Sequence, residues 1–262
     1  MFLLFAVLVC SVSARLPRVG IVHGENQEMQ NLENFLLQAF PGGVDIWDAS
    51  EVDVPFTWLL QFDALLVFAD TGFQTEATCG NLASYLDQGG RVVTGLFSTG
   101  EDEEDATGAC NFGEFNATYL VQVPIVPGGY TTGQVYIQTI FQPDHPIMQG
   151  VANISYTGWH TLPPQSFVSG SYIVADWTNN GSLVAVRDGV GPYGRSRVDL
   201  GFWPFPREDG HYSNCFWTNG TAGACPELLT LVVQSLEYTL RDFSSSASTL
   251  SPFWLSLLSY FF

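Results

Sequence analysis

Short apolar segments alternate with amphipathic segments through the first hundred residues, and this alternation limits the fold more than any other feature. Apolar runs at 19–23, 44–47, 64–69 and 91–95 have the length and composition of strands buried in a parallel sheet. Apolar residues recur at helical spacing over 29–39, and a second helix is expected at about 75–86, before Gly89-Gly90. The order strand, helix, strand, strand, helix, strand predicts an α/β fold with a doubly wound, mostly parallel sheet.

The second half of the chain has a different pattern. Residues 115–142 are rich in Val, Tyr, Ile and Thr with intervening Pro and Gly, which predicts strands and a hairpin. The segments 171–177, 183–187 and 198–203 are further strand candidates. An amphipathic helix is expected at 226–242, with Pro226 in its first turn. The sequence therefore predicts an additional β-rich part and a closing helix.

The chain begins with a segment typical of a secretory signal peptide. The apolar run from Phe2 to Val12 is too short to span a bilayer, and small residues follow at Ser13 and Ala14. The alternative is a buried first strand, but Arg15-Leu16-Pro17-Arg18 interrupts the run. We expect residues 1–14 to be a signal peptide that is cleaved after Ala14.

The C-terminal segment has the order of a signal for attachment of a GPI anchor. A serine-rich stretch begins at Ser244 and leads into an apolar tail that ends at Phe262. The alternative is a tail whose aromatic residues dock on the body. We expect one α/β domain at 15–243, a spacer and hydrophobic tail at 244–262, and Ser244 as the candidate attachment residue.

The charge balance excludes several classes of partner. The chain has 8 basic residues, all of them Arg, against 26 acidic residues, which gives a net charge of −18. Such a surface repels nucleic acid and anionic lipid headgroups. Contact with a membrane is therefore expected only through a C-terminal anchor.

Cysteine usage agrees with an oxidising compartment. Cys10 lies in the expected signal peptide, which leaves Cys79, Cys110, Cys215 and Cys225 in the mature chain. Four cysteines allow three pairings, and we predict the two local ones, Cys79–Cys110 and Cys215–Cys225. Neither spacing is a Cys-x-x-Cys pair, so a structural metal site is not expected.

Four sequons for N-glycosylation occur in the body. They begin at Asn116, Asn153, Asn180 and Asn219, and none has proline at its middle position. In a secreted chain we expect these asparagines to carry glycans.

Several segments together resemble a known family. The segments 18–23, 63–70 and 82–93, followed by His145-Pro146-Ile147-Met148-Gln149-Gly150-Val151 and by 193–202, are similar in order and spacing to class I glutamine-amidotransferase-like domains. The likeness is to the trehalose-utilisation-type branch and covers most of residues 18–242. It implies a flavodoxin-like arrangement of the sheet.

The same resemblance shows where this chain departs from a working amidotransferase. The family places its nucleophilic Cys on a sharp turn after the strand that ends here at Gly95, but this chain continues Leu96-Phe97-Ser98-Thr99-Gly100. The family's His-x-Glu pair is also missing, because Pro146 and Ile147 follow His145. Glutaminase chemistry requires a thiolate, a histidine and a carboxylate, so we expect a degenerate, non-catalytic domain.

Three polar residues at the predicted carboxyl ends of strands are the best candidates for lining a ligand pocket. They are His23, Asp70 and Ser98, at the edge of the sheet where open α/β folds bind ligands. The alternative interpretation is that they only close the strand ends. Ser98 lacks the Gly-x-Ser-x-Gly pattern of a hydrolase nucleophile. A hydrolase would still need one of three candidate bases: His145, His160 and His211.

Two further features have structural and functional interpretations. The acidic run 101–105 lacks the spacing of an EF-hand, so it predicts a solvated loop, and we expect no metal or cofactor. The aromatic cluster at 202–206, with Phe216 and Trp217, is typical of a packed lobe, although aromatic rings also stack on sugars.

The sequence as a whole favours a secreted or cell-surface glycoprotein with a binding or assembly role. Glycans and surface proteins are the partner classes that fit this expectation. The alternative is an extracellular hydrolase that acts on glycans or esters.

Overall fold

The computed structural model describes residues 15–24, 29–69, 72–96, 114–123, 129–164, 166–204 and 226–246. Nine strands in this part of the chain form one mixed sheet in the order β2-β1-β3-β4-β11-β10-β9-β6-β7. The strands of the first half are β1 (Val19–Gly24), β2 (Val44–Asp48), β3 (Ala64–Ala69) and β4 (Val92–Thr94). They are parallel to one another, as the sequence predicted.

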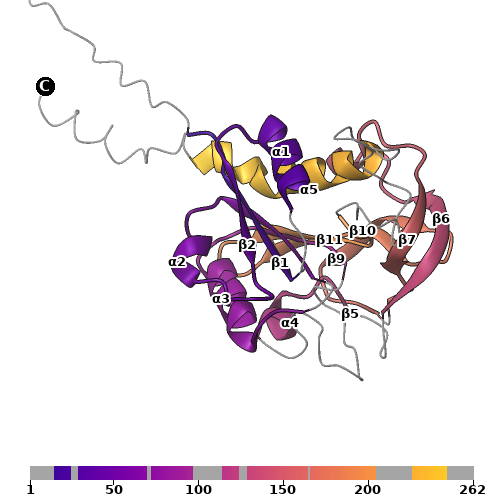
Figure 1. Cartoon of the computed structure of the whole chain (residues 1–262). Helices are drawn as coiled ribbons and strands as arrows, with labels where there is room; N and C mark the ends of the chain where they lie inside the picture. Colours follow the sequence, from indigo (N-terminus) through magenta and orange to yellow (C-terminus); the bar gives the residue numbers. More distant parts are fainter. Residues whose placement is uncertain are drawn as a thin grey trace, which may run out of the picture.

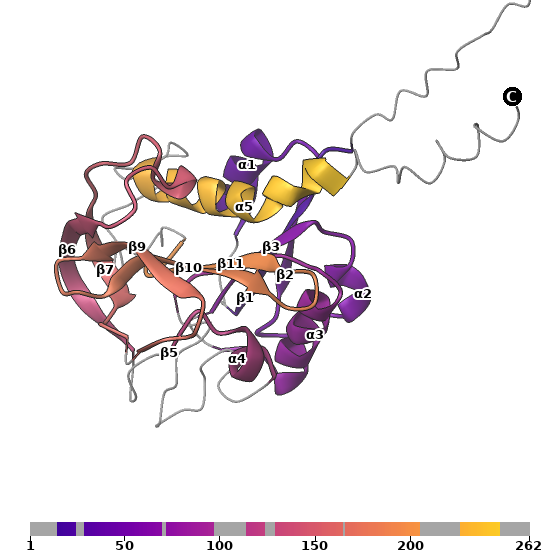
Figure 2. The ribbon, with the colours of Figure 1, turned by 180° about the vertical axis from the view of Figure 1, so that it is seen from behind.

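Helices cover both faces of the sheet (Figures 1 and 2). One face carries α1 (Gln30–Ala39) and α5 (Pro226–Ser246), and the other carries α2 (Phe56–Leu59), α3 (Glu76–Asp87) and α4 (Glu114–Tyr119). Each layer has its own hydrophobic cluster, because the central strands are buried on both faces. The doubly wound α/β fold predicted from the sequence is therefore confirmed.

Local sequence explains where α3 begins and ends. The hydroxyl of Thr75 accepts a hydrogen bond from the backbone N–H of Ala77 at 3.1 Å, which is an N-cap contact. Gly89, just after the helix, has φ +84°, a conformation that only glycine adopts without strain. The predicted glycine pair thus follows the end of α3 and connects the helix to β4.

The β-rich part extends the same sheet. β11 (Arg195–Leu200) pairs parallel with β4, and β10 (Ser182–Val190), β9 (Ser171–Trp177), β6 (Tyr130–Ile140) and β7 (Ser155–Thr161) continue it antiparallel. A separate two-stranded sheet joins β5 (Gln122–Val123) and β8 (Ser166–Phe167), and a short 3₁₀ helix, η1 (Pro146–Met148), precedes β7.

The structure corrects the interpretation of residues 115–142. This segment begins with helix α4 and contains no hairpin of its own within the described residues, because β6 pairs with β7 and β9 and β5 pairs with β8. Phe115 and Tyr119 are one helical turn apart and both are buried against the layer of α3. Burial of these two rings on one helical face outweighs the strand propensity of the segment.

The closing helix is longer than expected. α5 continues through Ser246, beyond the end expected at 242, and Ser244 lies in its last turn. Among the described residues, no helix has the length and apolar character needed to cross a membrane.

Candidate functional site

The strand order creates a switch point at the centre of the parallel half of the sheet. β1 lies between β2 and β3, so the chain leaves β1 toward one side and later builds β3 and β4 on the other. In open α/β sheets the crevice at such a point, outside the carboxyl ends of the strands, is the usual ligand site. His23 and Gly24 end β1 at this place.

His23 is a buried imidazole at the switch point. It is 3% exposed, and its ring stacks on Phe68 of β3 with centroids 6.2 Å apart. Burial lowers the pKa of His23, and nearby Asp48 opposes part of that effect. Its Nδ1 atom has no hydrogen-bond partner within the described ranges, so one polar atom of the ring is unused at the carboxyl end of β1.

The other two predicted pocket residues, Asp70 and Ser98, lie outside the described residues. At this edge the described chain reaches Ala69, the last residue of β3, and Leu96, two residues beyond the end of β4.

Apolar groups pack tightly around the end of β4. A Cβ atom on Gly95 would lie 2.8 Å from the Pro204 ring and 3.1 Å from Phe68. Leu96 is 3% exposed, and its backbone N–H donates to the Phe202 carbonyl at 3.3 Å. Gly95 and Leu96, which follow β4, are thus part of the core.

A buried ion pair lies at the same edge on the opposite face of the sheet. The fully buried guanidinium of Arg197 donates to Asp199 Oδ1 at 2.8 Å and to Thr94 Oγ1 at 3.1 Å. It also donates to the Tyr119 carbonyl at 2.7 Å and lies 4.6 Å above the Phe115 ring. These contacts tie β4, β11 and α4 together.

Two of the three histidines proposed as catalytic bases have structural partners. His160 is buried, with Nδ1 2.9 Å from the Gly158 carbonyl. Nδ1 of His145 accepts from the Ile147 N–H, which caps η1, and its Nε2 lies 3.3 Å from the Tyr172 hydroxyl. His211 lies outside the described part of the chain.

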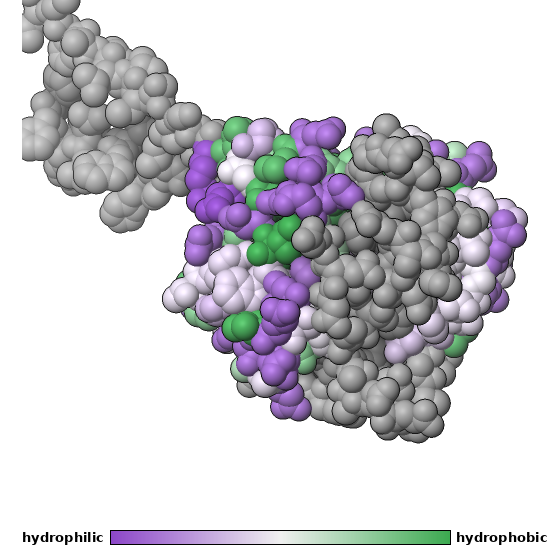
Figure 3. Space-filling view, in the orientation of Figure 1, coloured by the Kyte–Doolittle hydropathy of each residue, from purple (hydrophilic) through white to green (hydrophobic). Residues whose placement is uncertain are grey.

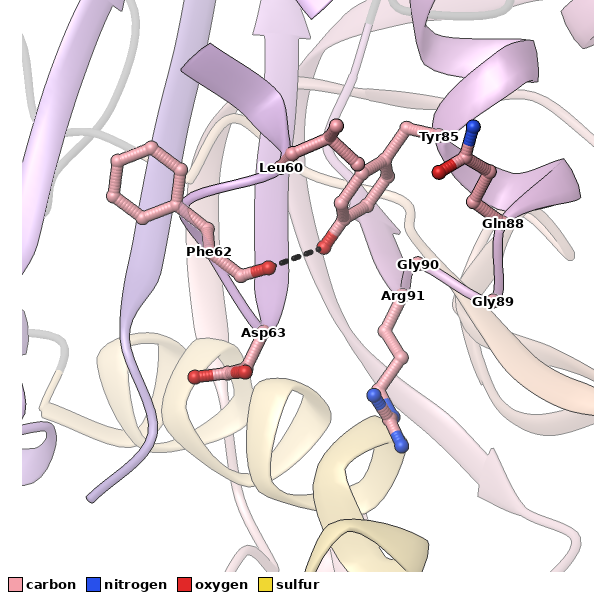
Figure 4. Close-up of a pocket in the computed structure, with 8 residues that line it drawn as sticks. All are labelled: Leu60, Phe62, Asp63, Tyr85, Gln88, Gly89, Gly90 and Arg91. Carbon is pink, nitrogen blue, oxygen red and sulfur yellow. Dashed lines mark hydrogen bonds between the residues drawn. The ribbon is translucent and has the colours of Figure 1, made fainter. Parts of the chain in front are cut away.

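A small pocket of about 160 Å³ occurs at the opposite, amino edge of the strands (Figure 4). Figure 4 shows the Tyr85 ring spanning the pocket, where its hydroxyl donates to the Phe62 carbonyl at 3.2 Å. Asp63 accepts from the Arg15 side chain at 2.5 Å and from the Arg18 N–H at 2.8 Å. Because these groups hold the two turns together, we regard the pocket as structural. Its lining is Leu60, Phe62, Asp63, Tyr85, Gln88, Gly89, Gly90 and Arg91.

The predicted modification sites are only partly described. Asn153 and Asn180 are exposed, while Asn116 lies in α4 and Asn219 lies outside the described residues. Cys79 is buried on α3. The other three cysteines of the predicted disulfides fall outside the described residues: Cys110, Cys215 and Cys225.

The sequence interpretation missed the ion pair of Arg197 and Asp199. Its signal was the pattern Arg-x-Asp at the start of the strand predicted at 198–203, since residues two apart on a strand point to the same face. A charged pair that is buried must be satisfied internally.

Comparison with known proteins shows similarity in structure without similarity in sequence. No protein-family model matches the chain, and no curated protein is similar to it in sequence. A protein described as ThuA-like from Bacteroides uniformis superposes with a TM-score of 0.52 at 12% identity, over 87% of this chain and 93% of that one.

Two further solved structures give the same result. A ThuA-like protein from Parabacteroides merdae has a TM-score of 0.51 at 16% identity, over 86% of this chain and 90% of that one. A protein described as a GMP synthase subunit, from Thermoplasma acidophilum, has a TM-score of 0.51 at 10% identity, over 88% of this chain and 98% of that one. The chain therefore has the fold of class I glutamine-amidotransferase-like proteins.

Proposed function

We propose that this chain is an extracytoplasmic glycoprotein, secreted or held at the cell surface, whose amidotransferase-like domain binds a ligand or partner instead of hydrolysing glutamine. The fold supplies the scaffold, and the signal-like start and the sequons support the location. The partner classes that fit are glycans and surface proteins.

One observation carries the non-catalytic part of the proposal, namely the packing at the end of β4. Gly95 is in close contact with Pro204, and Leu96 is buried where an amidotransferase turns sharply toward its nucleophile. An acyl-transfer nucleophile must reach the substrate and a base within hydrogen-bond distance. Core packing at this turn favours a role in stability.

The buried His23 supports a binding role for the same edge. An imidazole whose pKa is lowered by burial, and whose Nδ1 atom has no hydrogen-bond partner among the described residues, can accept or donate one hydrogen bond to a ligand. Phe68 and Trp203, whose rings meet edge to face at 5.3 Å, supply an apolar wall beside it.

The test combines a turnover assay with a binding screen on the full chain expressed in a secretory host. We expect no glutamine hydrolysis above buffer and no hydrolysis of chromogenic esters or glycosides. A screen of glycans and small molecules by thermal shift should find ligands whose effect is lost in His23→Ala but kept in His160→Ala.

The alternative, an extracellular hydrolase, makes the opposite prediction. If an ester or glycoside is turned over, and Ser98→Ala abolishes turnover while the circular dichroism spectrum is unchanged, the binding proposal is wrong.

The location is tested separately. Mature protein should begin at Arg15, and glycosidase treatment should lower its mass. If Ser244 carries a GPI anchor, phosphatidylinositol-specific phospholipase should release the protein from cells. Resistance to release, with the C-terminal peptide still detected by mass spectrometry, would contradict the anchor.

A further inference from the structure

A row of aromatic side chains lies on the α2 side of the sheet, beside its β2 edge. The Trp47 and Trp58 rings are 5.5 Å apart, and Trp58 lies 4.4 Å from Phe62. We call Trp47, Trp58 and Phe62 the aromatic row. The two tryptophans are half-buried, so part of each ring contacts solvent.

The surroundings of the aromatic row are more apolar than an ordinary surface. Val52 is 58% exposed and Leu60 is 48% exposed, and in the chain each lies between two members of the row. The surface over α2 is pale with green spots in Figure 3, which has the orientation of Figure 1. Trp47 donates its Nε1–H to the Val52 carbonyl at 2.8 Å, so the polar atom of its ring is already satisfied. What Trp47 offers a partner is therefore its π surface.

The chain itself shows that a guanidinium fits this place. The Arg18 side chain lies 5.1 Å above the Phe62 ring and donates to Asp45 Oδ2 at 2.9 Å. Asp45 and Trp47 are two residues apart on β2 and so lie on the same face of the strand. An aromatic face next to a carboxylate is the chemistry that recognises a cationic side chain.

Arg15 and Arg18 pair with Asp63 and Asp45, and the other charges near the row are acidic. Glu51 is exposed and precedes Val52, and Asp53 follows it. Within the described residues of 44–62 there is no basic side chain to neutralise them. The net charge of −18 further favours a basic partner over an acidic or neutral one.

β2 adds a backbone component to this surface. It is the terminal strand of the nine-stranded sheet and, among the described strands, pairs only with β1, so its other edge has no neighbouring strand there. An exposed edge can accept an extended segment of another chain through main-chain hydrogen bonds. Glu51, which is exposed and follows β2, would then favour basic side chains on that segment.

We propose that the β2 edge and the aromatic row form a docking surface for an extended, arginine-bearing segment of a partner protein. The segment adds to β2, and its guanidinium groups stack on Trp47 and Trp58 beside Glu51. This surface is distinct from the carboxyl edge at His23, so it stands whether or not that edge binds a ligand.

The experiment measures binding of a fluorescein-labelled nonapeptide of alternating Arg and Thr to the full chain by fluorescence anisotropy at physiological salt. The matched probe has citrulline in place of Arg, which keeps the shape and removes the charge. We expect the Arg peptide to bind at least about tenfold more tightly than the citrulline peptide. Trp58→Leu should weaken binding about fivefold, as expected for loss of one cation–π contact.

The matched control is Glu237→Gln, an exposed acidic residue on α5, on the other face of the sheet. Glu51→Gln should weaken binding of the Arg peptide, and Glu237→Gln should leave it unchanged. Hydrogen exchange of the unmutated chain should show new protection at 44–48 and none in α5, a readout that does not depend on how Trp58→Leu folds. Equal weakening by both Glu variants, equal binding of both peptides, or no protection at 44–48 overturns the proposal.

Discussion

Among single residues, the buried charges have the largest expected effect on stability. Arg197 has no exposed surface, and burial lowers the pKa of its guanidinium while Asp199 opposes that shift. Breaking a buried ion pair leaves the other charge without compensation, whereas an exposed pair is screened by water. The chain offers both cases, because Arg18 and Asp45 form an exposed pair.

We predict that Asp199→Asn lowers the free energy of unfolding by about 3–5 kcal/mol, the usual cost of an uncompensated buried charge. Asp45→Asn removes the same charge from the exposed pair and should cost no more than about 1 kcal/mol. Urea unfolding followed by circular dichroism measures both. If the two variants lost the same free energy of unfolding, Arg197 would have found another partner in Asp199→Asn.

Two glycines, one in α3 and one just after it, differ in the space that they leave for a Cβ atom. Gly80 lies within α3, where a Cβ atom would meet nothing within 4 Å. Gly90 follows the helix, and a Cβ atom there would lie 2.3 Å from the Tyr85 ring.

Gly80→Ala should therefore stabilise the protein by up to about 1 kcal/mol, because alanine favours the helix. Gly90→Ala should destabilise it by about 1–3 kcal/mol, since the buried Tyr85 must move. Thermal unfolding of the two variants measures the difference. A stable Gly90→Ala variant would show that the turn before β4 can shift.

At the scale of elements, a polar network holds α5 against the sheet. The Tyr238 hydroxyl on α5 donates to Asp188 of β10 at 3.1 Å and lies 3.2 Å from the Tyr172 hydroxyl of β9. His145 joins the network through Tyr172, and its ring lies 4.6 Å from that of Tyr238. Because the Ile147 N–H donates to Nδ1, the hydrogen-bond pattern assigns the proton of neutral His145 to Nε2.

This network predicts a pH dependence. Burial and nearby Arg241 lower the pKa of His145 below its ordinary value of 6.5, and Asp188 opposes them. A lowered pKa in the folded state means that the stability is complete above about pH 6.5 and is lost as the pH falls through the lowered value. Protonation would also put a hydrogen on Nδ1 of His145. This atom could then no longer accept the hydrogen bond from the Ile147 N–H.

His145→Asn is the test, because asparagine can cap η1 but does not titrate. Urea unfolding between pH 8 and pH 5 should show a smaller acid loss in His145→Asn than in the unmodified chain. The other histidines are the same in both proteins, so the difference reports His145. Identical pH profiles would contradict the assignment.

At the scale of the whole molecule, the start of the described chain and the end of α5 lie side by side (Figures 1 and 2). This end is the amino edge of the parallel strands, where Arg15 pairs with Asp63. If a membrane anchor is attached after α5, the amino edge would lie toward the membrane. The carboxyl edge with His23 would then point away from the membrane.

The glycan prediction belongs to this scale. Asn153 and Asn180 are exposed, but the hydroxyl of Ser182, in the Asn180 sequon, is buried and donates to Gln122 at 2.5 Å. Transfer to Asn180 must therefore precede folding. In a secretory eukaryotic host, Asn153→Gln and Asn180→Gln should each remove one glycan by intact-mass analysis. A mass unchanged by either substitution would contradict its use.

The disulfide prediction also depends on the tertiary arrangement. α4 packs against α3, and Cys110 precedes α4 by four residues, so the chain can bring Cys110 to the buried Cys79. Non-reducing peptide mapping should yield Cys79 linked to Cys110 and Cys215 linked to Cys225. A peptide that links Cys79 to Cys215 or Cys225 would rule this pairing out.

The sequence by itself determined the parallel half of the sheet. Strands such as 64–69 are apolar on both faces, and α3 is bounded by Thr75 and Gly89, so pattern and local chemistry agree. The position of His23 at a strand end followed from the same pattern.

Only the tertiary structure decided the rest. α4 replaced a predicted strand because Phe115 and Tyr119 gain burial from a helix, and β6 found its partners far along the chain in β7 and β9. The ion pair of Arg197 and Asp199 is completed by groups from β4 and α4, and the aromatic row joins residues from separate elements. Such contacts depend on which elements pack together, and local propensity carries no information about that choice.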